Sequence, residues 1–320
     1  HPSSAWGIIR AMKHFSISQL SLLIILALLL AACNSDSTAS PTASQSEPAA
    51  TATLSPDQPT DTPVLPTATP EPLAALVNGE ALTLAEYNAE LARFQAAQAE
   101  TGTNLATEEA AARVLDYLVD AMLLAQAARE AGFVVDEASL QARVDALVSQ
   151  LGGAQVLADW MAVNGYSETT FRKALGREMA AALMRDQVAL GVPETADQAH
   201  ARQILLYNSE QAVQVLTLLQ GGRDFADLAE DYDPLTGGDL GWFPRGYLLS
   251  SAVEEAAFSL QPGEFSGVIE TPMGFHIVQL VERDAQHPLS SDARRALQTQ
   301  AVQNWLAERR NSSDIQVLLP

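Results

Sequence analysis

The sequence predicts an α+β protein with more than one folded part. Between about residues 84 and 190, apolar residues recur at helical spacing, which predicts a mostly helical region. Between residues 200 and 283, the apolar runs are shorter and glycine and proline separate them, which predicts a small sheet with surrounding helices. A chain of 320 residues is long enough for two modest domains.

The composition limits the partners and the chemistry. Acidic residues outnumber basic ones by 39 to 18, which gives a formal net charge of −21. Because nucleic-acid binding needs a basic face, we expect no nucleic-acid partner. The single cysteine, Cys33, excludes an intramolecular disulfide framework. No metal-ligand cluster, phosphate-binding loop or nucleophile–base pair is recognisable, so we expect neither a metal nor a cofactor.

Residues 1–33 have the pattern of a secretory signal. Arg10 and Lys13 precede an apolar run over residues 17–32, which ends in Leu-Ala-Ala before Cys33. This ending resembles the lipobox of bacterial lipoproteins, which implies that Cys33 is lipidated and becomes the first mature residue. The alternative is an uncleaved transmembrane anchor, although a span needs about 20 apolar residues. Met12 would also make a natural start.

Residues 34–72 predict a disordered linker. The segment is rich in Ser, Thr, Ala and Pro and has no Lys or Arg. Such a composition cannot bury a core. Its place between the lipobox and the folded region predicts a tether, and a low-complexity tail without a role is the alternative.

The helical region opens with a strand and a turn. Ala75–Glu80 reads as a short strand with an Asn-Gly turn, and Thr83 with Glu86 has the spacing of a capping box. Further helices are expected over residues 108–131, 136–151, 154–164 and 167–190.

The second region alternates shorter elements. We expect strand, helix, helix, helix, strand and strand over residues 200–206, 209–221, 224–232, 251–260, 266–270 and 274–283, with a short strand near Gly241. Residues 292–310 predict another amphipathic helix, and residues 315–319 predict a closing strand.

Residues 237–243, Gly-Gly-Asp-Leu-Gly-Trp-Phe, are the most informative stretch. Three glycines in five positions indicate a tight turn or a close backbone approach, and by itself the stretch reads as a turn before a buried strand. Four further blocks, Asp224–Tyr232, Arg245–Gly246, Ala256–Glu264 and Gly274–Val278, flank it in fixed order. In this order and spacing the segment resembles the parvulin-type peptidyl-prolyl isomerases, particularly the extracytoplasmic foldases of the PrsA and SurA type.

The resemblance implies a domain plan. Residues 197–285 would form a parvulin-like isomerase domain, and residues 73–196 resemble the helical chaperone domain of the SurA type. In the related foldases the C-terminal segment packs back onto that domain. Residues 286–320 would therefore complete it, the parvulin-like domain would be an insertion, and the strand at Leu76 would pair with the one at Val317.

Proline isomerisation needs no covalent step, because the catalyst only has to favour the twisted amide over the planar forms. Parvulins use an apolar pocket beside two histidines and a Cys or Asp. By motif, the catalytic positions fall on His276, Thr271 and Gln203, and Gln203 replaces the first histidine. Leu235 occupies the Cys or Asp position. His200, three residues before Gln203, would point to the opposite face of its strand.

By the same motifs, the substrate pocket falls on Leu240, Phe243, Leu248 and Val253, together with Leu235. Val253 replaces a larger phenylalanine, which would make the slot shallower. His276 could instead be a structural histidine buried in a strand.

The favoured function is that of a foldase lipid-anchored through Cys33 on the extracytoplasmic face of the membrane. It would bind unfolded or proline-containing secreted polypeptides and isomerise Xaa-Pro bonds, with activity reduced by Gln203 and Leu235. The alternative is a non-catalytic holdase or scaffold with a degenerate parvulin domain. A solute-binding lipoprotein would explain the signal and tether but not residues 237–243.

Overall fold

The computed structural model describes residues 71–103 and 105–319. The expected signal, Cys33 and nearly all of the expected linker lie outside the described residues. The described residues divide into two compact units, the first containing residues 71–103, 105–119, 157–167 and 314–319, and the second residues 120–156 and 168–313. Helices and a sheet occur in both units, so the α+β prediction is confirmed.

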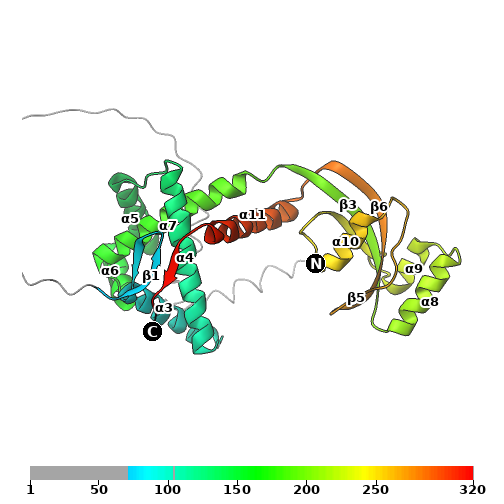
Figure 1. The fold of residues 1–320 in the computed structure, drawn as a ribbon, viewed down its shortest axis with the longest axis horizontal. Helices are drawn as coiled ribbons and strands as arrows, with labels where there is room; N and C mark the ends of the chain where they lie inside the picture. The colour runs from blue at the N-terminus through cyan, green and yellow to red at the C-terminus, as the bar shows by residue number, and fades with distance from the viewer. Residues whose placement is uncertain (1–70, 104, 320) are drawn as a thin grey trace, which may run out of the picture. The chain divides into compact units, whose positions relative to one another are not determined.

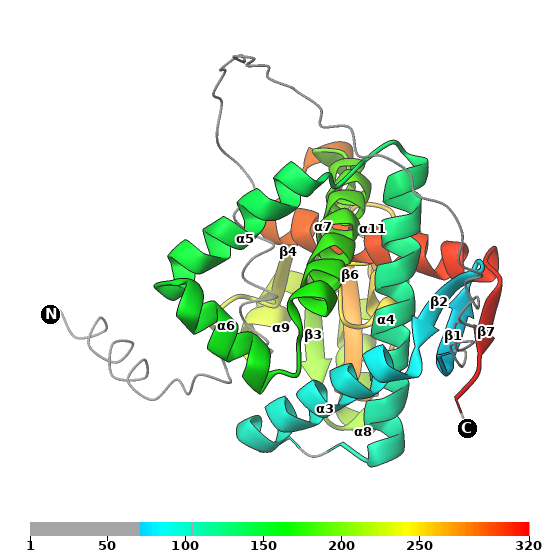
Figure 2. The same cartoon turned by 90° about the vertical axis from the view of Figure 1, so that its left-hand side faces the viewer.

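The first unit contains a three-stranded antiparallel sheet of order β2–β1–β7 (Figure 2). Its strands are β1 (Leu73–Val77), β2 (Glu80–Thr83) and β7 (Ile315–Val317). Asn78 and Gly79 have φ of 52° and 80°, as a two-residue hairpin turn requires. Ala75 pairs with Val317, so the predicted pairing of these two distant strands is confirmed.

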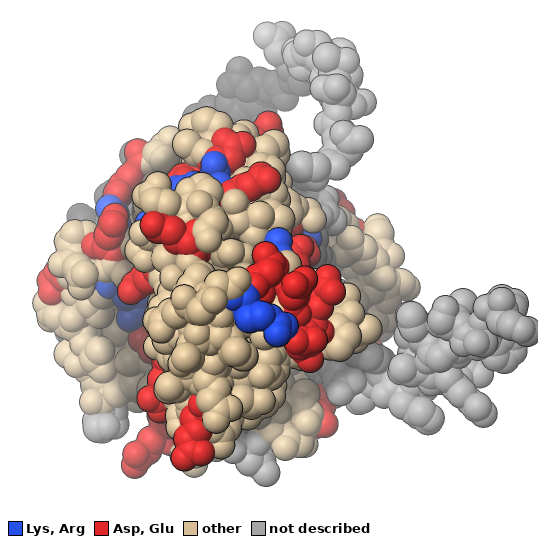
Figure 3. Space-filling view, turned by 90° about the vertical axis from the view of Figure 1, so that its right-hand side faces the viewer, with Lys and Arg blue, Asp and Glu red and all other residues tan. Residues whose placement is uncertain are grey.

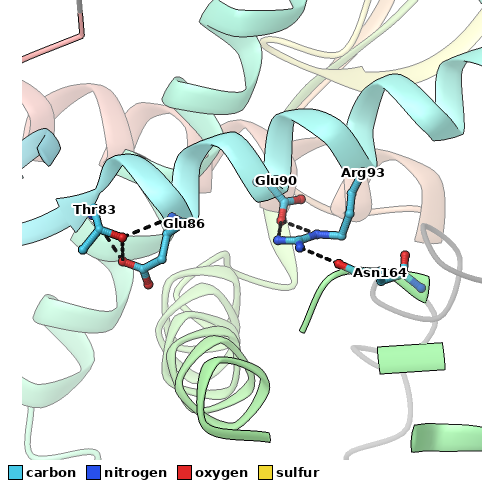
Figure 4. Close-up of polar contacts among 5 residues, drawn as sticks. All are labelled: Thr83, Glu86, Glu90, Arg93 and Asn164. Atoms are coloured by element: carbon cyan, nitrogen blue, oxygen red, sulfur yellow. Dashed lines mark hydrogen bonds and ion pairs between the residues drawn. The ribbon is translucent and has the colours of Figure 1, made fainter. Parts of the chain in front are cut away.

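The predicted capping box opens α3 (Leu84–Thr101). The Thr83 hydroxyl accepts from the Glu86 N–H at 3.1 Å, and the Glu86 carboxylate accepts from the Thr83 N–H at 3.3 Å (Figure 4). The next helix, α4 (Thr107–Glu130), runs across the boundary between the units. The large apolar residues that this helix buries include Val114, Leu118, Val119, Met122 and Leu123.

Arg93 fastens α3 to the chain that follows α6 (Ala154–Val163). Its guanidinium donates to the Glu90 carboxylate and, at 2.9 Å, to the Asn164 carbonyl (Figure 4). The same group lies 4.1 Å above the Tyr166 ring, a cation–π arrangement. These contacts tie residues 71 positions apart in the sequence within the first unit.

Three long helices of the second unit agree with their predicted ranges to within a residue at each end. They are α5 (Glu137–Leu151), α7 (Glu168–Leu190) and α11 (Ser291–Asn311), and α7 packs against both of the others. Along α7, the apolar residue Phe171 is buried whereas Leu183 is exposed.

The second unit also contains a four-stranded antiparallel sheet of order β4–β3–β6–β5, of which Figure 1 labels β3, β6 and β5. Its strands are β3 (Thr195–Leu206), β4 (Asp239–Pro244), β5 (Ile269–Thr271) and β6 (Gly274–Pro288). The long central strands pair from Thr195 with Pro288 to Leu206 with Phe275. Three helices accompany the sheet, α8 (Ser209–Gln220), α9 (Phe225–Tyr232) and α10 (Ser251–Ser259).

Each face of this sheet has its own apolar core, because successive side chains of a strand point to opposite faces. On one face, Ile204, Leu206 and Ile277 pack with residues of α8 and α9. On the other face, Ala199, Ala201, Val278 and Leu280 pack with Phe243 and residues of α10.

Acidic side chains are spread over the surface shown in Figure 3 and gather in one group beside a few basic ones. None of the helices formed by residues 71–103 and 105–319 combines the length and apolar character that crossing a membrane requires.

Candidate active site

The face of the sheet that packs on α10 carries a chain of three polar side chains. His276 Nδ1 lies 2.8 Å from Gln203 Oε1, and His276 Nε2 lies 2.8 Å from Thr271 Oγ1. The register explains this meeting, since His276 pairs with Leu205 on β3 and with Ile269 on β5. Gln203 and Thr271 each lie two positions along from those partners and therefore point to the same face as His276.

The hydrogen bonds select one neutral tautomer of His276. An amide oxygen only accepts, so His276 Nδ1 carries the proton and donates it to Gln203 Oε1. His276 Nε2 then accepts from the Thr271 hydroxyl, whose oxygen accepts from the Met273 N–H at 3.1 Å. The result is a continuous chain of donors and acceptors that runs across three strands.

Burial keeps His276 neutral. The side chain is 1% exposed, and desolvation lowers the pKa of His276 below its ordinary value of 6.5. At neutral pH the ring is therefore uncharged, and it donates one hydrogen bond to Gln203 and accepts one from Thr271.

Four of the expected pocket residues meet in one apolar cluster, namely Leu240, Phe243, Leu248 and Val253. Phe243 and Val253 are buried, and the other two are half-buried. The ring of Phe243 meets that of Phe258 edge-on at 6.0 Å.

This apolar cluster and the polar chain share one face of the sheet. Val278, a member of the cluster, follows His276 by two residues on β6. Ala201, another member, precedes Gln203 by two residues on β3. The arrangement places an apolar core directly beside polar groups that donate and accept hydrogen bonds.

Leu235 differs from these residues in burial, since its side chain is 94% exposed. Asp233, two residues earlier, caps its own turn and accepts from the N–H groups of Leu235 at 3.2 Å and Thr236 at 3.3 Å. The hydrogen bonds from Thr236 in particular lower the pKa of Asp233. The carboxylate of Asp233 is therefore committed to its turn.

Gly238 joins this turn to the polar chain. The N–H of Gln203 donates to the Gly238 carbonyl at 2.8 Å. Gly238 has a φ of 67°, and a Cβ at this position would collide with the Gln203 carbonyl oxygen. The close backbone approach that the glycine pair indicated is therefore the approach to Gln203 itself.

His200 lies on the opposite face, as its odd spacing from Gln203 predicts. Its Nε2 is 2.8 Å from Asp239 Oδ1, and its ring faces Trp242 at 5.5 Å. Asp239 also caps its turn by accepting from the Gly241 N–H at 2.9 Å. Burial alone would raise the pKa of Asp239, but the hydrogen bonds from Gly241 and His200 outweigh it, and the pKa is lowered.

Glu254 belongs to the site by its contacts, and the motifs did not indicate it. Its carboxylate is buried and holds the loop that carries Leu248. One pattern could have found it. Glu254 lies three and four residues before Ala257 and Phe258, both of which face the core, so the helical period places a carboxylate on the buried side of α10.

Two family models match the chain. The model of the PPIC-type peptidyl-prolyl isomerase domain matches residues 190–282, and that of the SurA-like N-terminal domain matches residues 66–157. The resemblance to parvulins and to SurA-type foldases is therefore confirmed for these two segments. The roles of the individual site residues and the exact domain boundaries stay predictions.

The chain is also similar to curated chaperones and foldases. Chaperone SurA of Nitrosospira multiformis is 32% identical over 145 residues, which cover 38% of this chain and 32% of the relative. Foldase protein PrsA of a Geobacillus species is 31% identical over 124 residues, covering 37% and 44%. Chaperone SurA of Chromohalobacter salexigens is 29% identical over 261 residues, covering 70% and 60%. The chain thus spans less than two thirds of each of these relatives.

Among solved structures, the peptidylprolyl isomerase PrsA of Bacillus cereus matches with a TM-score of 0.45 and 18% identity, over 76% of this chain and 91% of that chain. NmPin, the parvulin of Nitrosopumilus maritimus, matches with a TM-score of 0.25 and 28% identity, over 27% of this chain and 98% of that chain.

Proposed function

We propose that this chain, which carries a PPIC-type peptidyl-prolyl isomerase domain and a SurA-like N-terminal domain, isomerises Xaa-Pro bonds of unfolded secreted polypeptides and holds those polypeptides while they fold. The observation that carries the proposal is the hydrogen-bonded chain Gln203–His276–Thr271 beside the apolar cluster of Phe243. The names of the relatives, chaperone and foldase, agree with both activities.

Prolyl isomerisation requires of the protein only that apolar and polar groups are correctly positioned around the bond. The barrier to rotation about a peptide bond is about 18–20 kcal/mol, because rotation disrupts the amide conjugation. A site that weakens this conjugation in the bound peptide lowers the barrier. The apolar cluster around Phe243 receives the proline ring and draws the bond out of water. The polar chain through His276 then stabilises the twisted amide more than the planar forms, because the charge distribution on its nitrogen and carbonyl differs from theirs. No bond is made or broken.

Each residue has a separate role in this proposal. His276, held in one tautomer by Gln203 and Thr271, keeps the polar chain aligned beside the slot. Leu240, Phe243, Leu248 and Val253 line the proline slot. Leu235, exposed at its turn, contacts the substrate residues that flank proline.

In this proposal, Gln203 lowers the rate of prolyl isomerisation. A glutamine donates and accepts hydrogen bonds, but it cannot change its charge as a histidine does. Leu235 likewise brings no polar group to the position where parvulins have Cys or Asp. The Gln203→His variant is therefore expected to isomerise faster than the natural chain.

The anchor is part of the proposal. Cys33, lipidated after cleavage of the signal, would hold the chain on the extracytoplasmic face of the membrane, and residues 34–72 would tether the folded parts. The sequence pattern at residues 30–33 and the foldase relatives support this placement. Labelling with a radioactive fatty acid in a bacterial host should mark the natural chain and not Cys33→Ala. Equal labelling of both chains would exclude Cys33 as the anchor.

Prolyl isomerisation by the full chain tests the function, with a short peptide that has one Leu-Pro bond. His276→Ala should lower kcat/KM about 100-fold, the cost of removing one well-placed polar group. The matched control is His200→Ala, which removes the histidine of the opposite face and should leave kcat/KM within about twofold.

A second candidate is a holdase without catalysis, which the exposure of Leu235 and the glutamine at position 203 favour. Failure of the folded natural chain to accelerate the peptide, together with suppression of aggregation of an unfolded protein, would select the holdase. Failure in both assays would exclude both functions.

A further inference from the structure

Glu254 is a carboxylate buried in an apolar neighbourhood. Its side chain is 7% exposed and lies in the first turn of α10, directly after Val253. Ala257 and Phe258, three and four residues further along the same helix, are members of the apolar cluster. A carboxylate in such a place is unfavourable unless hydrogen bonds satisfy its oxygens.

Three consecutive backbone groups satisfy it. Glu254 Oε1 accepts from the Gly246 N–H at 2.7 Å, and Oε2 accepts from the N–H groups of Tyr247 at 3.0 Å and Leu248 at 3.1 Å. These residues form the loop between β4 and α10. Successive N–H groups that converge on one point make a nest for an anion, and the protein fills this nest with its own side chain.

We propose that Glu254 is a positioning residue that holds the proline slot in shape. Leu248 packs against the cluster that contains Phe243 and Val253, and the backbone of Leu248 is one of the three groups that Glu254 holds. Leu249, the next residue, is 98% exposed, so no packing of its own side chain fixes this loop. The carboxylate clamp therefore sets where the Leu248 wall of the slot stands. This inference rests on the proposed isomerase function.

The clamp needs both oxygens of a carboxylate. Oε1 serves Gly246, and Oε2 serves Tyr247 and Leu248. A glutamine offers one oxygen and one NH2 group, and an NH2 group cannot accept from an N–H. Glu254→Gln therefore keeps the size of the side chain but loses at least one of the three bonds, which releases the loop.

The test compares Glu254→Gln with Glu255→Gln in the full chain. The control removes the same charge one residue later, from an exposed side chain. For the Leu-Pro peptide, we expect Glu254→Gln to raise KM about tenfold while kcat changes less than about twofold, because the slot is loosened and the polar chain is intact. The control should leave KM unchanged.

Amide hydrogen exchange supplies a readout that does not depend on turnover. In Glu254→Gln, the amides of Gly246, Tyr247 and Leu248 should exchange at least about tenfold faster, whereas those of Ile204 and Ile277 in the central strands should keep their protection. A folded Glu254→Gln that has the natural KM, or the same loop exchange as Glu255→Gln, would overturn the proposal.

Leu248→Ala covers the case in which Glu254→Gln does not fold. It removes the wall but not the clamp, so it should raise KM while the three loop amides keep their protection; an unchanged KM would overturn the proposal. If the natural chain binds the peptide without isomerising it, the dissociation constant replaces KM in the same comparisons. A natural chain that neither isomerises nor binds would overturn the proposed function, and the role of Glu254 with it.

Discussion

The two faces of the four-stranded sheet are built from the same strands but differ in what they bury. The face that packs on α8 and α9 is closed by apolar side chains such as Ile204, Leu206 and Ile277. The face that packs on α10 has an apolar core of similar kind, yet it also buries His276 and Glu254. Buried polar groups cost stability unless every hydrogen bond is made. Gln198, a further buried polar residue of β3, lies by alternation on the other face and donates to the carbonyls of His287 and Pro288. What sets the α10 face apart is that both of its buried polar groups, His276 and Glu254, are titratable.

Two of the three histidines in the sheet, His276 and His200, show the same contrast. His276 is buried, neutral and held between two polar side chains. His200 is partly exposed, is bonded to the carboxylate of Asp239 and faces the ring of Trp242. The residue type is identical, so the face of the sheet decides the environment of the ring.

The largest expected effect comes from removing one large side chain from the core on each face of the sheet. Phe243→Ala and Phe225→Ala should each lower the free energy of unfolding by about 3–5 kcal/mol, because both rings are buried and leave cavities. Chemical denaturation of the full chain measures this loss. Under conditions where both variants remain folded, only Phe243→Ala should weaken binding of a proline peptide. Equal loss of binding in the two variants would show that the faces are not functionally distinct.

Two adjacent glycines at the edge of the site, Gly237 and Gly238, should differ in how much stability an added Cβ costs. Gly237 and Gly238 have similar φ, 61° and 67°, but a Cβ at Gly237 would meet only an ordinary contact at 3.6 Å. Gly237→Ala should therefore cost about 1–2 kcal/mol of stability for the left-handed backbone alone. Gly238→Ala adds a collision with the Gln203 carbonyl and should cost about 3 kcal/mol or more.

Thermal and chemical unfolding of both glycine variants measures the difference. Gly238→Ala should in addition lower prolyl isomerase activity, since the Gln203 backbone must shift. Equal stability of the two variants would mean that the turn relaxes away from β3 without cost.

Local chemistry determined what the sequence could predict. The bounds of α5, α7 and α11 agree with prediction because apolar periodicity and capping residues are local features. The alternation along β3 placed His200 on the opposite face from Gln203, and the structure agrees. The central strands are longer than expected, since β3 begins at Thr195 and β6 ends at Pro288. Their extension comes from pairing with each other, which no local pattern reports.

Two features of the site depend on tertiary contacts that the motifs did not specify. The exposure of Leu235 follows from the turn that Asp233 caps, and motif matching placed the residue by sequence position alone. The clamp of Glu254 needs a loop to return to the start of α10. A charged residue at a core-facing position was the one sign of it.

The last expected effect concerns pH and follows from the burial of His276. Burial lowers the pKa of His276 in the folded state, whereas the unfolded chain has the ordinary value of about 6.5. Between these two values the unfolded chain binds more protons, so stability is complete above about pH 7 and falls as the pH drops through 6.5 toward the folded pKa. Each unit of pKa depression corresponds to about 1.4 kcal/mol.

Unfolding free energies of the full chain between pH 8 and 5 should therefore fall more steeply for the natural protein than for His276→Gln, which cannot titrate. His200→Gln is the matched control and should keep the steeper fall, because it leaves the buried ring in place. The pH range matters, since Asp197, Asp233 and Asp239 have lowered pKa values and titrate below it. The same slope in the natural chain and in His276→Gln would mean that water reaches the ring of His276. Burial on the α10 face would then not lower the pKa of this histidine.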